Sequence, residues 1–139
     1  MDKSGKKKVM VFGTFDIFHP GHRSFLRQAR KYGEYLVVVV ARDKTVEVVK
    51  KKKTTDDEQE RANVIRKSGL VEEVVLGSLG DKYEVIEKHR PDVICLGYDQ
   101  KFFIEKLKEK LEEFELNKTE IIRLDPYYPE KYKSSKLRK

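Results

Sequence analysis

The distribution of apolar residues is the feature that most limits what this chain can fold into. Apolar side chains gather in short runs that do not alternate with polar ones. The runs are Val9–Phe12, Tyr35–Ala41, Val74–Leu76, Val93–Leu96, and Ile121-Ile122 with Leu124. Runs of this kind are typical of strands that are buried on both faces, as in parallel sheets. The sequence therefore predicts a parallel sheet of about five strands.

Amphipathic segments separate these runs, with apolar residues at helical spacing. The predicted helices cover Pro20–Tyr32, Asp57–Lys67, Lys82–His89 and Phe102–Phe114. Strand and helix in repetition imply right-handed crossovers and a doubly wound, Rossmann-like α/β fold. Since the chain has 139 residues, we expect one domain over residues 1–139. Within it we expect residues 1–7 to be disordered and residues 50–55 to form a mobile loop.

The composition of the chain indicates which kinds of partner and which cellular compartment to expect. The formal net charge of +7 favours anionic partners such as phosphorylated small molecules, nucleic acid or an anionic membrane surface. The longest wholly apolar run, Leu36–Ala41, is far shorter than the ~20 residues that cross a bilayer. The single cysteine, Cys95, excludes an internal disulfide and suits a reducing compartment. We expect a cytoplasmic protein without a membrane partner.

The segment Gly13–His22 follows the first predicted strand and opens the first predicted helix. Pro20 fits the first helical position, which places His19 near the N-cap and His22 in the first turn. Residues three apart share a helix face, so both imidazoles can point at one spot. That spot lies in front of unpaired backbone N–H groups, where anions bind, and Gly21 leaves room for a phosphate to approach.

Two imidazoles at a helix N-terminus suit nucleotidyl transfer, which depends mainly on positioning and on stabilising negative charge. An acceptor that is itself a phosphate is already ionised and needs no general base. A surface pair of histidines, or half of a metal site, is the plainer interpretation of the same spacing. The third histidine, His89, lies on the amino-terminal side of a predicted strand, so we expect no protein-built metal cluster.

Gly13–His22 resembles the HxGH motif of the cytidylyltransferase-like nucleotidyltransferase family. Four further segments look most like the archaeal-type FAD synthases, namely Val38–Asp43, Glu58–Arg61, Leu76–Ser78 and Pro91–Gln100. That resemblance implies transfer of AMP from ATP to FMN with release of pyrophosphate, aided by a divalent cation (Mg²⁺ or similar) bound with ATP. Glycerol-3-phosphate cytidylyltransferases are similar in the first motif and in Ser134–Arg138. A cytidylyltransferase acting on a small phosphorylated alcohol is therefore the alternative enzyme.

The resemblance also implies roles for individual residues. Four are expected to be catalytic: His19, His22, Lys44 and Arg61. Nucleotide binding is expected of Thr14, Phe15, His19, Pro20, Gly21, His22, Asp99, Tyr127, Ser134 and Ser135. In this scheme Arg61 approaches the phosphates of the nucleotide and Lys44 meets the phosphate of the acceptor, whereas Asp99 contacts the nucleoside and Tyr127 lies against the base.

Simpler structural roles stay open for several of these residues. Lys44 and Arg61 could belong to solvated faces, Asp99 could cap a helix that begins near Lys101, and Ser134 and Ser135 could be tail residues. A nucleic-acid-binding module, suggested by Lys50–Lys53, lacks any accompanying recognition pattern. A non-catalytic nucleotide-binding relative is the third class, and a homodimer is possible through the exposed edge of a small sheet.

Overall fold

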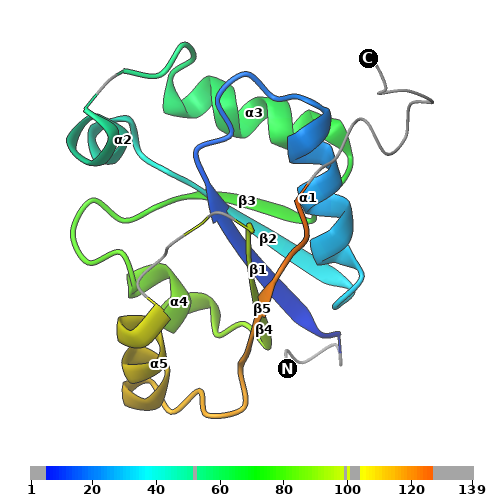
Figure 1. The fold of residues 1–139 in the computed structure, drawn as a ribbon, viewed down its shortest axis with the longest axis vertical. Helices are drawn as coiled ribbons and strands as arrows, with labels where there is room; N and C mark the ends of the chain where they lie inside the picture. Colours follow the sequence, from blue (N-terminus) through cyan, green and yellow to red (C-terminus); the bar gives the residue numbers. More distant parts are fainter. Residues whose placement is uncertain (1–5, 52, 99, 101–103, 127–139) are drawn as a thin grey trace.

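The computed structural model describes residues 6–51, 53–98, 100 and 104–126, and it contains the expected parallel sheet (Figure 1). The five strands are β1 (Lys8–Gly13), β2 (Tyr35–Val40), β3 (Glu73–Leu76), β4 (Val93–Leu96) and β5 (Glu120–Arg123). They pair in the order β3-β2-β1-β4-β5, and each pair is parallel. The predicted fold class is thus confirmed, and no strand end differs from the end of its apolar run by more than one residue.

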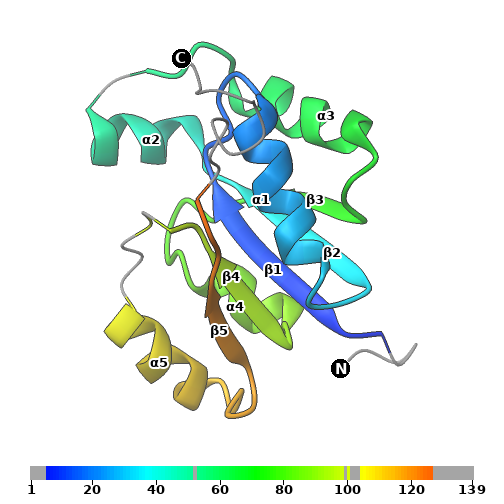
Figure 2. The same ribbon diagram turned by 45° about the vertical axis from the view of Figure 1, so that its right-hand side comes forward.

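Helices cover both faces of the sheet. They are α1 (Pro20–Arg30), α2 (Asp43–Lys50), α3 (Glu58–Ser68), α4 (Glu84–His89) and α5 (Ile104–Glu113). Figures 1 and 2 show α1 and α3 on one side of the sheet and α4 and α5 on the other. Each side has its own cluster of buried apolar side chains, so the sheet is doubly wound.

The two clusters explain why the apolar runs of the sequence do not alternate with polar residues. Val9 and Val11 of β1 pack into the cluster under α1 and α3, whereas Met10 and Phe12 pack into the cluster under α4 and α5. Both faces of the strand are therefore closed to water. Burying each such side chain contributes about 1.5–3 kcal/mol, so a polar residue at any of these positions is disfavoured.

Helix α2 has no counterpart among the predicted helices. Its β-branched residues lower the intrinsic helix propensity of the segment, but contacts with α3 stabilise its first turn. The Glu58 carboxylate accepts a hydrogen bond from the Asp43 N–H (2.8 Å), and the Asp43 carboxylate accepts one from the Glu58 N–H (3.2 Å). Each helix thus caps the start of the other, which local sequence patterns do not reveal.

The segments expected to be disordered or mobile are partly attached to the fold. Lys7 donates its N–H to the Glu34 carboxylate (2.8 Å), and residues 1–5 lie outside the described residues. Lys50 ends α2, and the Thr55 N–H bonds to the Asp16 carboxylate (2.8 Å). The mobility of residues 50–55 remains a prediction.

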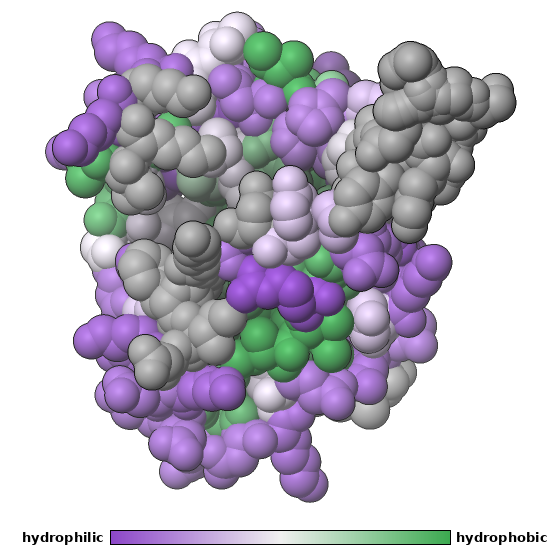
Figure 3. Space-filling model, viewed as in Figure 1, coloured by the Kyte–Doolittle hydropathy of each residue, from purple (hydrophilic) through white to green (hydrophobic). Residues whose placement is uncertain are grey.

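The pairing of β1 with its two neighbours creates the place where a ligand can bind. β1 pairs with β2 as far as Gly13, but with β4 only as far as Val11. Strand order reverses between β1 and β4, and the carboxyl ends of the two strands separate there. Ligands of open α/β sheets bind in this crevice. The surface is mostly hydrophilic in the view of Figure 3, with a hydrophobic patch over β5. Among the described residues no helix is both long and apolar enough to cross a membrane.

Candidate active site

The turn between β1 and α1 folds back on itself at Gly13. A Cβ atom on Gly13 would lie 2.7 Å from the ring of Phe15, so any other residue here would force that ring to move. Phe15 is buried and has a left-handed backbone conformation (φ 54°), as has Ile17 (φ 53°). Such conformations are uncommon for side chains of this size and cluster at functional sites. The turn therefore holds a strained, specific shape that directs the start of α1.

His19 and His22 cap the N-terminus of α1 through their imidazole rings. Nδ1 of His19 accepts from the Gly21 N–H (3.1 Å), and Nδ1 of His22 accepts from the His19 N–H (3.3 Å). A neutral imidazole that accepts through Nδ1 carries its proton on Nε2. The ring centroids are 3.8 Å apart and the ring planes differ by 21°. The two rings are thus stacked face to face, and the hydrogen bonds at Nδ1 assign the donor role of each neutral ring to Nε2.

Neighbouring rings fix the orientation of the His22 imidazole. Phe18 stacks on it with 5.6 Å between centroids, and Phe15 meets it edge to face at 5.3 Å. The Arg23 guanidinium lies 4.9 Å from the centroid of Phe18. The first turn of α1 holds no acidic side chain. The Arg23 guanidinium, the imidazole rings and the positive end of the helix dipole therefore lie near one another, which favours an anion.

Arg61 lies beneath the turn and is buried, with only 1% of the residue exposed. Its guanidinium donates to the Thr14 carbonyl (2.8 Å), the Asp43 carboxylate (2.6 Å) and the Asp56 carbonyl (3.1 Å). Burial disfavours the ionised Asp43 carboxylate, but the hydrogen bond and charge of Arg61, with the Glu58 N–H, outweigh it and lower the pKa of Asp43. Arg61 therefore faces the fold and joins the β1–α1 turn to α2 and α3.

Asp16 makes a second connection between the β1–α1 turn and the chain before α3. Its carboxylate accepts from the N–H groups of Thr55 (2.8 Å) and Asp56 (3.1 Å). Burial opposes ionisation, but these two backbone hydrogen bonds, with the charge of Arg61, lower the pKa of Asp16. The carboxylate is thus ionised and engaged with the backbone.

Most of the site residues predicted from the sequence lie at one edge of the sheet. Thr14, Phe15, His19, Pro20, Gly21 and His22 share the β1–α1 turn and the first turn of α1. Lys44 is exposed in the first turn of α2, directly after β2, at the same edge of the sheet. Arg61 reaches this edge from α3 but points into the protein. Asp99, Tyr127, Ser134 and Ser135 lie outside the described residues.

Two glutamines to which the sequence analysis assigns no role also lie at this edge. Oε1 of Gln100 accepts from the Gly97 N–H (2.7 Å), and its Nε2 donates to the Phe12 carbonyl (2.8 Å). This amide bridges the separated ends of β1 and β4. Gln28 of α1 makes a similar pair of bonds to the backbone of Asp125. Gln100 ends the segment Pro91–Gln100, which carries part of the family resemblance, whereas nothing in the sequence distinguishes Gln28 from an ordinary polar helix residue.

The described residues do not build a metal cage. No three His, Cys, Asp or Glu side chains among them gather closely enough to hold an ion. The two carboxylates nearest the turn, Asp16 and Asp43, are already bonded to backbone N–H groups and to Arg61.

The fold and the site together define a nucleotidyltransferase of the Rossmann-like type, and comparison with known proteins gives its family. The Cytidylyltransferase-like family model matches residues 10–139, and the chain belongs to this family. An FAD synthase from Thermococcus onnurineus is 40% identical over 99% of this chain and 93% of its own length. One from Ferroglobus placidus is 48% identical over 85% of this chain and 76% of its own length.

A solved structure is similar over nearly the same span. The lipopolysaccharide core biosynthesis protein from Thermoplasma volcanium has 38% sequence identity and a TM-score of 0.83, over 89% of this chain and 100% of that protein. Within the family, then, this chain is most simply compared with the archaeal FAD synthases, whose sequences it resembles along almost its whole length.

Proposed function

We propose that this protein is an FAD synthase, which transfers AMP from ATP to FMN and releases pyrophosphate. The observation that carries the proposal is the pair of stacked imidazoles at the N-terminus of α1, each of which accepts a backbone N–H through Nδ1. They lie where strand order reverses in a nucleotide-binding type of sheet. The identity of 40–48% to FAD synthases selects AMP transfer to a flavin among the reactions this site could perform.

In the proposed reaction an FMN phosphate oxygen attacks the α-phosphorus of ATP. A new P–O bond forms, the bond from the α-phosphorus to the α,β-bridging oxygen breaks, and pyrophosphate leaves with that electron pair. FMN phosphate is already ionised, so no side chain needs to remove a proton. His19 and His22 donate hydrogen bonds to the phosphate oxygens as negative charge spreads over them. A donor of this kind is typically worth about 3–4 kcal/mol in the transition state.

The remaining residues have supporting roles in the proposal. Thr14 and Phe15 form the turn that receives the nucleotide, and Pro20 and Gly21 let its phosphates approach the backbone of α1. Lys44 meets the phosphate of FMN. Asp99 contacts the nucleoside, Tyr127 lies against the base, and Ser134 and Ser135 donate to the triphosphate. Arg61 acts on the phosphates through its charge. Its hydrogen bond to the Thr14 carbonyl (2.8 Å) supports a second role, in which Arg61 holds the β1–α1 turn in place.

A divalent cation, Mg²⁺ or similar, enters the proposal bound to ATP. When bound, it neutralises and bridges phosphate oxygens. We assign it to the nucleotide because no cage exists among the described residues, and we route no step of the reaction through it.

The proposal places the enzyme in the cytoplasm with small-molecule substrates, without nucleic acid or membrane partners. A homodimer is part of the same proposal, since β3 and β5 are the outer strands of the sheet that the described residues form, and outer strands can pair with a second chain.

The test is product formation by purified protein. ATP, FMN and Mg²⁺ should give FAD and pyrophosphate, measured by chromatography, and CTP with glycerol 3-phosphate should give no CDP-glycerol. The reverse pattern would establish the alternative cytidylyltransferase. Tight ATP binding without any product from either pair would establish a non-catalytic relative.

A further inference from the structure

Helix α1 carries basic side chains at both of its ends. Arg27 and Arg30 lie in its last turn, where the negative end of the helix dipole stabilises a cation. Arg23 lies near the opposite end, and its N–H bonds to the His19 carbonyl (3.1 Å) and so closes the first turn of the helix. A cation at that end is repelled by the positive end of the dipole. The position of Arg23 is therefore unfavourable for the helix taken alone.

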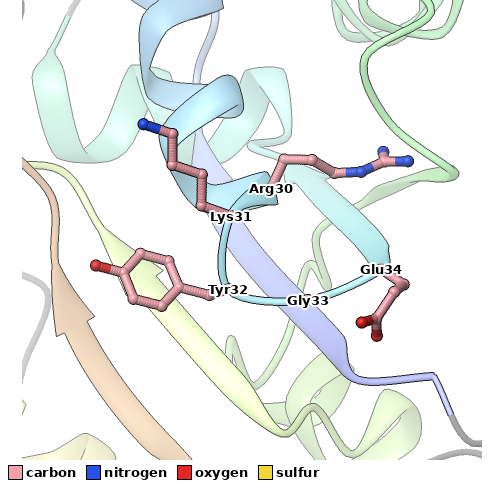
Figure 4. A pocket seen from close by; sticks show the side chains of 5 residues that line it. All are labelled: Arg30, Lys31, Tyr32, Gly33 and Glu34. Atoms are coloured by element: carbon pink, nitrogen blue, oxygen red, sulfur yellow. The ribbon is translucent and has the colours of Figure 1, made fainter.

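Arg30 shows how a partner in the protein can satisfy an arginine of this helix. Its guanidinium bonds to the Glu72 carboxylate (2.7 Å) and to the Leu70 carbonyl (3.1 Å). In Figure 4 Arg30 points to one side of the turn from α1 to β2, and Lys31 and Tyr32 point to the other side. The cavity of about 390 Å³ at this turn is thus lined by side chains that diverge, and it offers no set of groups that converges on a ligand.

The Arg23 guanidinium has no such partner among the residues that the structure describes. No carboxylate of those residues forms an ion pair with it. It lies instead over the Phe18 ring, 4.9 Å from the centroid, a distance at which a cation is attracted to the face of the ring. This contact restrains the guanidinium and leaves its N–H groups able to donate to a ligand.

Phe18 connects this guanidinium to the histidine pair. The Phe18 ring stacks on His22, with 5.6 Å between centroids, and His22 stacks on His19, with 3.8 Å between centroids. The four flat groups therefore follow one another in a row at the start of α1, and Arg23 lies at the end of the row that is further from His19. When the imidazoles bind one phosphate of a nucleotide, the guanidinium is placed to meet a neighbouring phosphate.

The direction of the proposed reaction indicates which neighbouring phosphate this is. In an in-line displacement the attacking and leaving oxygens lie on opposite sides of the phosphorus. The acceptor phosphate is proposed to meet Lys44 of α2, directly after β2. Helix α1 is instead attached towards β5, because the Gln28 amide bonds to the backbone of Asp125, and β5 lies on the other side of β1 from β2. We therefore expect the leaving group on the side of α1.

From these observations we propose that Arg23 binds the β- and γ-phosphates of ATP and neutralises pyrophosphate as it leaves. The inference rests on the proposed function and adds a residue to which the sequence analysis assigns no role. A guanidinium donates two N–H groups to phosphate oxygens in one plane. When the bond between the α-phosphorus and the bridging oxygen breaks, that oxygen gains negative charge, and the cation stabilises the departing group. Attraction to this anion offsets the repulsion between Arg23 and the helix dipole.

The test compares Arg23→Met with Arg27→Met, which removes the same charge from an exposed position one turn further along α1. Calorimetric titration with Mg²⁺ present measures the binding of ATP and of the two products, pyrophosphate and FAD. We expect Arg23→Met to weaken ATP and pyrophosphate binding about tenfold, and FAD binding and the KM for FMN to stay within twofold of wild type. Arg27→Met should keep all the wild-type affinities. Arg23→Lys, which keeps the charge, should bind pyrophosphate within threefold of wild type.

The Tm and the salt dependence separate the charge of Arg23 from a structural role. Loss of the contact with Phe18 and relief of the repulsion by the helix dipole oppose each other, so the Tm of Arg23→Met should stay within about 2 °C of wild type. Because salt screens exposed charges, the difference in pyrophosphate affinity should shrink at high ionic strength.

Three results would overturn the assignment of Arg23 to the leaving group. They are an unchanged pyrophosphate affinity in Arg23→Met, an equal weakening of FAD and pyrophosphate, and a loss of pyrophosphate affinity in Arg27→Met as large as in Arg23→Met. If the wild-type protein forms no FAD from ATP and FMN, the proposed function has failed. The titrations with ATP and pyrophosphate do not depend on turnover and still decide whether Arg23 binds these phosphates.

Discussion

Replacing Arg61 by methionine separates two roles for this residue, one in catalysis and one in holding the turn. The change keeps the apolar stem but removes a buried guanidinium with three protein partners. Breaking a buried pair typically costs 3–5 kcal/mol. The Asp43 side chain is 36% exposed and can regain water, so the lower end applies. We expect Arg61→Met to lower the free energy of unfolding by about 3 kcal/mol, and the Tm by roughly 10–15 °C.

Urea unfolding measures this loss, with the m-value as a check that both proteins unfold in the same way. The matched control is Arg66→Met on the same helix. Arg66 is exposed and bonds to Asn63 and the Val74 carbonyl, so its loss should change stability by less than about 0.5 kcal/mol. A loss below about 1 kcal/mol for Arg61→Met, together with a large fall in kcat, would refute the anchoring role and favour direct action on phosphate.

The pH dependence of the stability tests the Arg61–Asp43 interaction independently. The pKa of Asp43 is lowered from 3.8 in the folded protein, so its contribution to stability is present above pH 3.8 and is lost as the pH falls through the folded pKa. Arg61→Met removes the main cause of that lowering. The stability difference between wild type and variant should therefore shrink as the pH falls below 3.8, and a difference that grows there would contradict the assignment.

Three further outcomes follow from the site and the core. His22→Gln retains an acceptor for the helix cap but removes the imidazole. We expect kcat to fall several hundredfold with little change in ATP affinity. An equal loss of ATP affinity would show that His22 binds ATP in the ground state and does not act mainly on the transition state. Gln100→Glu cannot donate to the Phe12 carbonyl (2.8 Å), and the KM for ATP should rise about tenfold, whereas Gln28→Glu, away from the β1–β4 ends, serves for comparison. Burial raises the pKa of the Cys95 thiol to about 12, so iodoacetamide at pH 8 should label it only in urea, and rapid labelling of native protein would show an open core.

The sheet and the histidine pair were predictable from the sequence because each depends on local spacing. Continuous apolar runs predict strands that are closed on both faces, and Pro20 together with His19 and His22 predicts a helix N-terminus with two imidazoles. The tautomer of the rings was not predictable, since it depends on which backbone N–H groups reach Nδ1. Helix α2 was missed because its cap comes from Glu58, fifteen residues further along the chain.

The role of Arg61 shows a different limit of sequence reasoning. A basic residue after an acidic pair in a charged helix gives no sign of which way it points. Its burial follows only from the meeting of the β1–α1 turn, α2 and α3. A cavity at the carboxyl end of β3 is likewise lined by residues from β3, α4 and the start of α2. No single segment of the sequence predicts such a cavity.

The reciprocal capping of α2 and α3 has a consequence for how this edge can move. Because the Asp43 and Glu58 side chains each bond the first N–H of the other's helix, loosening of one helix start removes a hydrogen bond from the other. Helix α3 keeps its own Asp57–Glu60 capping box, whereas the start of α2 has no side-chain cap from its N-cap residue, Arg42, so we expect α2 to loosen first. Arg42 and Lys44 stand at the start of α2, so the placement of both side chains depends on this capping.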